Sequence, residues 1–366
     1  MKKAVFWAKN NTVYVIFGAL LIVLTALYPH FIVQYPKFIN WQTIATITGL
    51  IIVTTGIEMS ALLDGFTLYM VSRSENELFL AMRLVFLTIV LSAFITNDIS
   101  LFIVIPITLR IQKFIKNDVK RIIVFEAIAA NTGSALTPIG NPQNIYLFHV
   151  WHIGVWKFIV SMLPMFIVLI SVIFAFVLLF FGKKPLDISE ENTEKRIKNT
   201  PLFVTSVIFI ALYFLLMSRT VYIYILLLLI VSVYLLFFRD VFKNSDFMLI
   251  LLFCLMFIDF NVISRIPIIK SAVYALNLKN AKTLFLFSLF MSQIISNVPA
   301  SVFVSVYSSN YGIIAYGVNI GGNGFIVASL ANIIALRLSK KNIFGEFHKY
   351  SVPFLVITAI IVCIIL

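Results

Sequence analysis

Long runs of apolar residues, separated by short polar segments, fill almost the whole chain. Nine of these runs approach or reach the roughly 17 to 25 residues that a helix needs to cross a bilayer. They lie at about 13–28, 40–62, 122–148, 157–182, 200–217, 222–238, 246–264, 313–336 and 351–366. Transmembrane β-strands would alternate apolar and polar residues, whereas 222–238 is apolar on every face. The pattern predicts an all-α polytopic membrane protein with about nine spans.

Two further apolar stretches, 78–109 and 283–308, have polar residues at their centres. These residues are Thr96, Asn97 and Asp98 in the first stretch, and Ser296, Asn297 and Pro299 in the second. A break facing lipid would leave backbone groups without hydrogen-bond partners, at several kcal/mol each. We therefore expect two re-entrant hairpins whose tips are buried in protein or in a wet cavity.

Composition agrees with a membrane protein and excludes a water-soluble one. Only 12% of the residues are charged, against about one quarter in soluble domains, and the mean hydropathy is +1.04. The net charge of +13 does not indicate nucleic acid as a partner, because the basic residues separate membrane spans instead of forming one soluble face. Cys254 and Cys363 lie inside apolar runs and are expected to pack there.

The distribution of basic residues predicts the orientation. With a cytoplasmic N-terminus, twenty lysine and arginine residues lie in inner segments and seven in outer ones. This is the positive-inside asymmetry of a protein of the cytoplasmic membrane. The first apolar run ends in Tyr28, Pro29 and His30 without a small-residue cleavage site, so we expect a retained span and not a cleaved leader.

The charged segment 183–199 is expected to be a cytoplasmic linker between two halves, 1–182 and 200–366. Each half contains one hairpin followed by one interrupted span. An offset of 188 residues aligns the interruptions and matches Asn131 with Asn319, Gly133 with Gly321 and Asn144 with Asn332. Because the charge distribution places the two hairpin bases on opposite sides, the halves are predicted to be inverted repeats, a plan common in secondary transporters.

Glycine and proline residues explain why these two spans are interrupted. Gly140, Gly321 and Gly322 permit unusual backbone angles, and Pro138 and Pro142 remove backbone donors. The freed groups suit a ligand: helix N-termini favour an anion, and carbonyl, Asn or Thr oxygens favour sodium. Alternatively, the small residues serve close helix packing.

Four motifs together resemble the ion transporter superfamily of arsenite permeases, citrate transporters, divalent anion/sodium symporters and some sodium/proton antiporters. They are TND followed by SLFIVIP, NTGSALTPIGNPQN, SNVPAS, and NIGGNGFIVASLAN. The resemblance covers about residue 40 to the end. It implies two hairpin tips and two unwound spans that meet at the substrate, a scaffold that often dimerises, and elevator-like movement.

The resemblance also implies a set of substrate- or ion-binding residues. They are Thr96, Asn97, Asp98, Asn131, Thr132, Gly133, Thr137, Gly140, Asn141, Asn144, Ser296, Asn297, Pro299, Asn319, Gly321, Gly322, Asn323 and Asn332. Dicarboxylate symporters have Ser-Asn-Thr at both tips, whereas this chain has Thr-Asn-Asp and Ser-Asn-Val. This departure argues against a dicarboxylate substrate and against two symmetric sodium sites.

Four carboxylates lie within apolar runs, where a charge is costly and indicates function. Asp98 is the leading candidate for coupling, with a helix cap as its structural alternative. Glu126 follows Arg121 by five residues, so an interfacial ion pair is an equal alternative, and Asp259 is either a coupling residue or interfacial. Glu58 fits either role. His149 and His152, with Trp151 and Trp156, favour an aromatic belt over a metal site.

These observations predict an ion-coupled secondary transporter for a small anion or oxyacid, similar to citrate or dicarboxylate permeases. The expected coupling ion is sodium or a proton, with no other cofactor or metal. Arsenite or antimonite efflux and sodium/proton antiport are the alternatives within transport. A polytopic membrane enzyme is the alternative of another class, although no acid–base pair, nucleophile motif or phosphate loop is evident.

Overall fold

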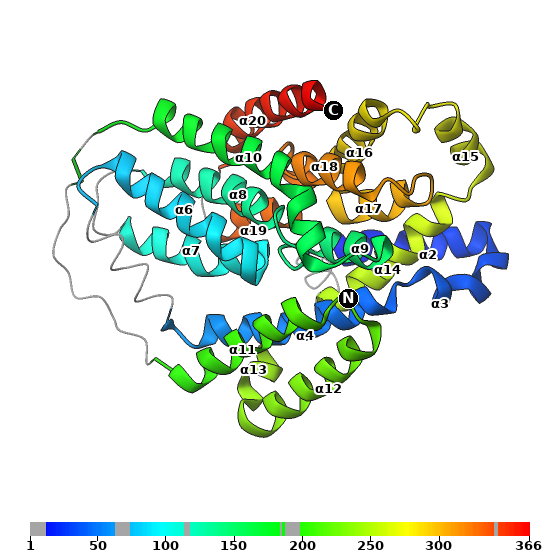
Figure 1. Cartoon of the computed structure of the whole chain (residues 1–366), viewed down its shortest axis with the longest axis horizontal. Helices are drawn as coiled ribbons and strands as arrows, with labels where there is room; N and C mark the ends of the chain where they lie inside the picture. The colour runs from blue at the N-terminus through cyan, green and yellow to red at the C-terminus, as the bar shows by residue number, and fades with distance from the viewer. Residues whose placement is uncertain (1–11, 63–73, 113–117, 184, 187–197, 340–342) are drawn as a thin grey trace, which may run out of the picture.

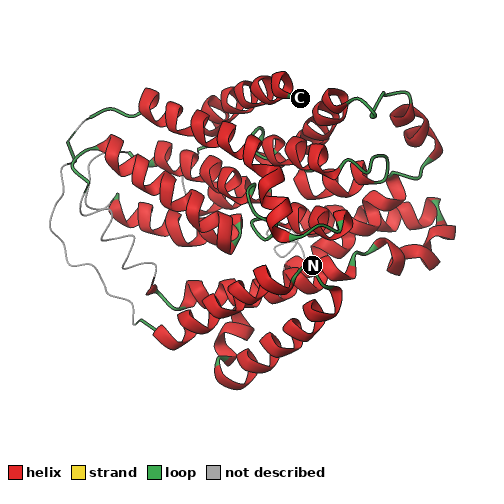
Figure 2. Ribbon diagram, viewed as in Figure 1, coloured by secondary structure: helices red, strands yellow, loops and turns green. Residues whose placement is uncertain are grey.

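The computed structural model of the chain describes residues 12–62, 74–112, 118–183, 185–186, 198–339 and 343–366. Apart from an isolated β-bridge between Asn76 and Pro185, every regular element of these residues is helical (Figures 1 and 2). The helices are α2 (Thr12–Leu27), η1 (Pro29–Gln34), α3 (Tyr35–Phe38), α4 (Trp41–Met59), α6 (Glu77–Ile95), α7 (Asn97–Ile111), α8 (Lys120–Ser134), α9 (Pro142–Trp151), α10 (Val155–Phe180), α11 (Thr200–Leu216), α12 (Thr220–Phe237), α13 (Arg239–Asn244), α14 (Met248–Ile263), α15 (Pro267–Tyr274), α16 (Ala281–Ile295), α17 (Asn297–Ser305), α18 (Tyr311–Gly321), η2 (Ile326–Ala328), α19 (Leu330–Leu338) and α20 (Phe344–Ile365).

Several helices are long and apolar enough to cross a membrane, so the predicted fold class is confirmed. Among the described residues they are α4, α6, α10, α12 and α20. Two more spans arise if bent pairs are joined: α2 turns by 116° into η1 and α3, and α14 turns by 76° into α15. The remaining predicted spans are the shorter helix α11, which has 17 residues, and the two interrupted helices.

Both predicted hairpins are present, each as two helices joined by one residue. Thr96 joins α6 to α7 with φ 75° and ψ 149°, and Ser296 joins α16 to α17 with φ 73° and ψ 158°. A positive φ is uncommon outside glycine, yet both tips use it with nearly equal angles. The two tips are therefore built as structural copies.

The hairpin bases lie at opposite ends of α10, a helix of 26 residues. The backbone N–H of Leu78, at the base of the first hairpin, donates to the carbonyl of Gly182 just after α10 (3.1 Å). Near the base of the second hairpin, Gly312 packs against Trp151, just before α10 begins. The hairpins therefore enter the molecule from opposite ends, as Figure 1 shows.

Two interrupted helices face the hairpins. The first is α8 and α9, which are separated by 135–141, and the second is α18 and α19, which are separated by 322–329. Helix α6 packs along α8, and α16 packs along α18. Each hairpin thus lies against the interrupted helix of its own half of the sequence.

The remaining helices form a second group. Helix α4 packs against α11, α12 and α13, and these helices lie together at the bottom of Figure 1. Helix α14 packs against α2 and also against α17 of the second hairpin. The linker 183–199 lies largely outside the described residues, as do residues 1–11. The hairpins therefore contact this second group of helices at α4 and α14.

Candidate functional site

A small cavity of about 20 Å³, called here the tip cavity, separates the two hairpin tips. Asn97 and Asp98 line it from the first tip, and Ser296, Asn297 and Val298 line it from the second. The structure thus brings together two residues of each polar triplet that the sequence singled out, although the triplets are about 200 residues apart in the chain. Thr96 and Pro299 do not line this cavity.

The first turns of four helices surround the tip cavity. Besides the starts of α7 and α17 at the tips, its lining includes Pro142 and Gln143 of α9, and Leu330 of α19. The N-terminus of a helix presents unpaired N–H groups and about half a positive charge. Four such termini around one cavity make a strongly anion-attracting environment.

Asp98 adds a carboxylate to this environment. The backbone N–H of Asp98 donates to Oδ1 of Asn97 (3.0 Å), so Asn97 provides the capping oxygen at the start of α7. Oδ1 of Asp98 itself is buried without a hydrogen-bond partner. The same is true of Oε1 of Gln143, a residue that is only 2% exposed. Both oxygens are free acceptors beside the tip cavity.

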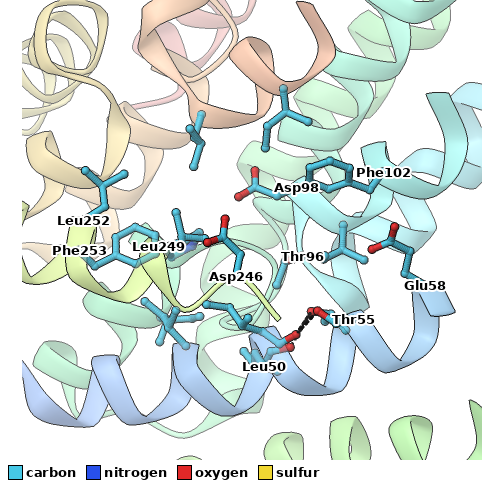
Figure 3. Close-up of a pocket in the computed structure, with 18 of the residues that line it drawn as sticks. Leu50, Thr55, Glu58, Thr96, Asp98, Phe102, Asp246, Leu249, Leu252 and Phe253 are labelled. Carbon is cyan, nitrogen blue, oxygen red and sulfur yellow. Dashed lines mark hydrogen bonds between the residues drawn. The ribbon is translucent and has the colours of Figure 1, made fainter. Parts of the chain in front are cut away.

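A larger cavity, with a volume of about 350 Å³, adjoins the tip cavity between α4, α7, α14 and α19 (Figure 3). Its walls are mostly apolar, but among the described residues its lining includes four charged side chains, those of Glu58, Asp98, Asp246 and Arg337. Figure 3 shows the side chains of Asp98 and Asp246 pointing toward one another into the cavity. Because Asp246 and Arg337 are exposed, we take their end of the cavity as its mouth.

The predicted asparagines lie behind the tips and bind one another. Nδ2 of Asn131 donates to Oδ1 of Asn332 (2.8 Å), and Nδ2 of Asn319 donates to Oδ1 of Asn144 (2.7 Å). All four side chains are buried. The structure therefore joins the two interrupted helices through hydrogen bonds that cross between the halves.

The other predicted site residues support the hairpin tips or the two breaks, the name used here for the interruptions at 135–141 and 322–329. The backbone N–H of Asn97 donates to the carbonyl of Gly140 (2.9 Å), which seats the first tip on the first break. Oγ1 of Thr137 donates to the carbonyl of Ala93 of the same hairpin. Gly322 accepts hydrogen bonds at its carbonyl from Asn131 and Asn332.

Five further predicted residues are buried in packing positions. Gly133 lies against Ile89 and Ser92 of α6, and Gly321 lies against Ser292 of α16. Asn323 is fully buried and donates to the carbonyl of Asn319 (3.4 Å). The buried residues Thr132 and Pro299 complete this group, and none of the five lines the tip cavity.

The four candidate carboxylates separate into two classes. Asp98 and Glu58 line the large cavity, whereas Glu126 and Asp259 do not. The ion pair considered between Glu126 and Arg121 is wrong: Arg121 donates to the carbonyl of Phe180 (2.6 Å) and lies 3.9 Å from Glu346. Glu126 is fully buried and accepts a hydrogen bond from Thr108.

Asp259 is fully buried in α14, and neither carboxyl oxygen has a hydrogen-bond partner among the described residues. Its depth in the membrane, and with it the choice between a coupling and an interfacial role, stays a prediction. His149 and His152 line one small cavity, but they differ in exposure: His149 is buried and shares a hydrogen bond with Thr46 of α4 (3.0 Å), whereas His152 is exposed. The described residues contain no group of three or more potential metal ligands.

The lining residues that were absent from the predicted set include Gln143, Asp246 and Arg337. Gln143 lies between two predicted asparagines in the NPQN motif, so its position in that motif was an available signal. Asp246 and Arg337 lie at the ends of apolar runs, where charged residues ordinarily mark the membrane surface. Nothing in the sequence distinguishes these two from other surface charges.

Comparison with known proteins decides the family. The sequence model of the family described as citrate transporter matches residues 4–311 of this chain. The chain belongs to the citrate transporter family. It is 37% identical to the uncharacterized transporter MJ0456 of Methanocaldococcus jannaschii over 329 residues, which are 89% of this chain and 88% of that protein. It is 33% identical to the inner membrane protein YbiR of Escherichia coli, over 90% and 88% of the two chains.

A shorter similarity connects this citrate transporter family member to the human P protein, with 27% identity over 113 residues, 30% of this chain and 13% of that protein. Membership in the family, together with the apolar helices, identifies the chain as a multi-pass membrane transporter. The predicted resemblance to the ion transporter superfamily is thereby confirmed.

Proposed function

We propose that this transporter is an ion-coupled secondary carrier that moves a small anion or oxyacid across the cytoplasmic membrane. The observation that carries the proposal is the convergence of four helix N-termini on the tip cavity. Their partial positive charges stabilise an anion there without a basic side chain. A movement of the hairpins and interrupted helices relative to α4 and α14, as in an elevator, would expose the anion on alternate sides.

Asp98 is the proposed coupling residue. It provides a carboxylate with a free oxygen beside the tip cavity, and the second tip has Val298 at the corresponding position. A sodium ion or a proton at Asp98 would offset the negative charge that otherwise opposes an anion. Coupling would then depend on the first repeat alone.

The function is tested by reconstituting the purified protein in liposomes with imposed sodium or proton gradients. The panel of labelled solutes is citrate, smaller carboxylates, phosphate, sulfate and arsenite. We expect gradient-dependent accumulation of at least one of them. Uptake that equilibrates without responding to either gradient, at rates beyond those of a carrier, would indicate a channel and overturn the proposal.

The role of Asp98 is tested by Asp98→Asn in the same liposomes. Because the amide retains the shape of the side chain but loses its charge, we expect exchange of substrate across the membrane to survive. Gradient-driven accumulation should fall at least tenfold, which corresponds to about 1.4 kcal/mol. Accumulation at the wild-type level would leave Asp98 without a coupling role and would direct the search to Glu58.

Sodium/proton antiport is the second candidate, favoured by the large cavity. Three carboxylates and one guanidinium line it, a balance that attracts cations. A pH-sensitive dye inside liposomes distinguishes the candidates: an antiporter moves protons when sodium is added without any organic or inorganic oxyanion substrate, whereas an anion symporter requires its anion.

A further inference from the structure

The asparagines of the two interrupted helices form a pattern that repeats at the offset of 188 residues found in the sequence. The bond from Asn131 to Asn332 is 2.8 Å long, and the bond from Asn319 to Asn144 is 2.7 Å long. Adding 188 to Asn131 gives Asn319, and subtracting 188 from Asn332 gives Asn144. One bond is therefore the image of the other, and each crosses between the halves.

The surrounding hydrogen bonds repeat in the same way. Nδ2 of Asn332 donates to the carbonyls of Gly322 (2.8 Å) and Phe325 (3.2 Å). Nδ2 of Asn144 donates to the carbonyls of Ser134 (3.1 Å) and Thr137 (3.0 Å), which are the residues 188 positions earlier. Each amide thus satisfies carbonyls that the interruption of its own helix leaves open.

The residues that begin α9 and α19 complete the symmetry. Asn141 precedes α9 and donates through Nδ2 to Oδ1 of Asn319 (3.0 Å). Ser329 precedes α19 and donates through Oγ to Oδ1 of Asn131 (3.0 Å), and these two donors are also 188 residues apart. Three kinds of bond are therefore present twice, once around each interruption.

These contacts leave Asn131 and Asn319 without capacity for a ligand. An asparagine side chain has two donor hydrogens and two acceptor lone pairs. Asn131 donates to the carbonyl of Gly322 and to Asn332, and accepts from Ser329 and, at 3.5 Å, from Asn97. Both donors and both lone pairs are in use.

Asn319 also makes four contacts, two of which are the equivalents of those of Asn131. It donates to Asn144 and to the carbonyl of Ala315 (2.8 Å), and accepts from Asn141 and, at 3.4 Å, from Gln143. Buried networks in which every group is satisfied are rigid and specify one arrangement. Such a network suits a support for a site better than a ligand-binding surface.

We propose that Asn131, Asn144, Asn319 and Asn332 are positioning residues. They form two symmetry-related clasps between the interrupted helices, one being the hydrogen bond between Asn131 and Asn332 and the other the bond between Asn319 and Asn144. The clasps act on the ligand through the tips: Asn97 contacts the first break at Gly140 and Asn131, and Ser296 donates to the carbonyl of Ala328 in the second break (3.3 Å). Direct contact with the ligand is left to the tips and to Gln143. The transport readout below rests on the proposed function, but the clasp itself does not.

A double-mutant cycle tests the clasp. The paired combination is Asn131→Ala with Asn332→Ala, two residues that share one bond. The control combination is Asn144→Ala with Asn332→Ala, which takes one residue from each clasp. If a clasp is one shared interaction, the paired double variant is no more damaged than the worse single variant, whereas the effects of the control pair add.

The cycle is measured by two readouts. The first is the thermal unfolding midpoint of the purified protein, which needs no substrate. The second is the KM and maximal rate of labelled citrate uptake into liposomes. We expect the ratio of maximal rate to KM to fall about tenfold in each single variant, a typical effect of losing one buried hydrogen bond. In the paired double variant this ratio should fall no further.

The outcomes separate the clasp from the function. If the losses of the two single variants add in the paired double variant, as in the control, the two asparagines do not act as one unit, and this result overturns the clasp. If the wild-type protein does not transport citrate, citrate is not the substrate. The double-mutant cycle measured by unfolding still shows whether the clasp exists. Should the alanine variants not purify, the same cycle with serine, which retains one hydroxyl, gives the same decision.

Discussion

Glu126 is a carboxylate that neither of the two cavities reaches. Its side chain is fully buried between α8 and α7, where Thr108 donates to one oxygen and the other oxygen has no partner among the described residues. A charge buried at this place would cost several kcal/mol. We therefore expect its contribution to be structural.

We accordingly expect liposomes with the Glu126→Gln variant to accumulate substrate to a level within about twofold of the wild-type level. The amide keeps an acceptor for Thr108 and the volume of the side chain. Glu126→Ala should lower the thermal unfolding midpoint, since loss of a buried side chain of this size typically costs about 2–5 kcal/mol. Gradient-driven uptake and unfolding of both variants are compared with Asp98→Asn. A Gln variant that folds normally but cannot accumulate substrate would assign coupling to Glu126 instead.

The prediction from sequence at the residue scale was limited by partners far away in the chain. The asparagine motifs were recognised, but Asn131 and Asn332 are separated by 201 residues, and no local pattern shows that they bind each other. Asp246 and Gln143 were missed because their position beside a cavity depends on how α14 and α9 pack. Local chemistry identified polar residues, whereas only the tertiary structure separates supports from lining residues.

At the scale of elements, glycine allows each hairpin to pack tightly against its interrupted helix. A Cβ built on Gly133 would lie 2.1 Å from the carbonyl oxygen of Ile89, and one on Gly321 would lie 2.7 Å from Cβ of Ser292. Both distances are shorter than van der Waals contact. The hairpins and breaks themselves were predictable, because proline, glycine and polar residues interrupt otherwise apolar runs. The bends that lead into α3 and α15 were not predicted, although Pro29 and Pro267 mark them.

Gly133→Ala should therefore destabilise the protein by about 1–3 kcal/mol or more, because overpacking forces the backbone of α6 away from α8. Gly321→Ala should have a smaller effect, since it meets mainly a side chain. Gly18→Ala is the matched control: none of the described residues would lie within 4 Å of the added Cβ, and alanine favours the helix. Unfolding midpoints in detergent report the differences, and equal midpoints for Gly133→Ala and Gly18→Ala would contradict the packing argument.

The whole molecule does not divide at the linker. Helix α4 belongs to the first half of the sequence but packs against α11, α12 and α13 of the second. The interrupted helices of the two halves also meet at the clasps. The sequence predicted two repeats and their order, but it could not predict this exchange, because the repeat signal lies in the hairpins and breaks and not in the helices around α4.

The opposite hairpin bases support the inverted arrangement, and the distribution of basic residues predicts which side is cytoplasmic. One hairpin base lies at each end of α10. The 26 residues of this helix span about 39 Å, close to the thickness of a bilayer with its headgroups. With Cys254 and Cys363 replaced, Asn192→Cys in the linker should react with impermeant thiol reagents only from the cytoplasm, and Tyr311→Cys only from outside. Reaction of both positions from one side would exclude the inverted arrangement.

The clasps also affect how the protein is made. Asn332 follows Asn131 by 201 residues, and Asn319 follows Asn144 by 175. A ribosome adds about 5–20 residues per second, so the first interrupted helix waits roughly 10–40 s for the amides that complete it. During that time Asn144 of the same repeat already satisfies the carbonyls of Ser134 and Thr137, but Nδ2 of Asn131 lacks both of its acceptors, Gly322 and Asn332. We therefore expect the half-made chain to depend on the insertion machinery, or on water, to shield this amide.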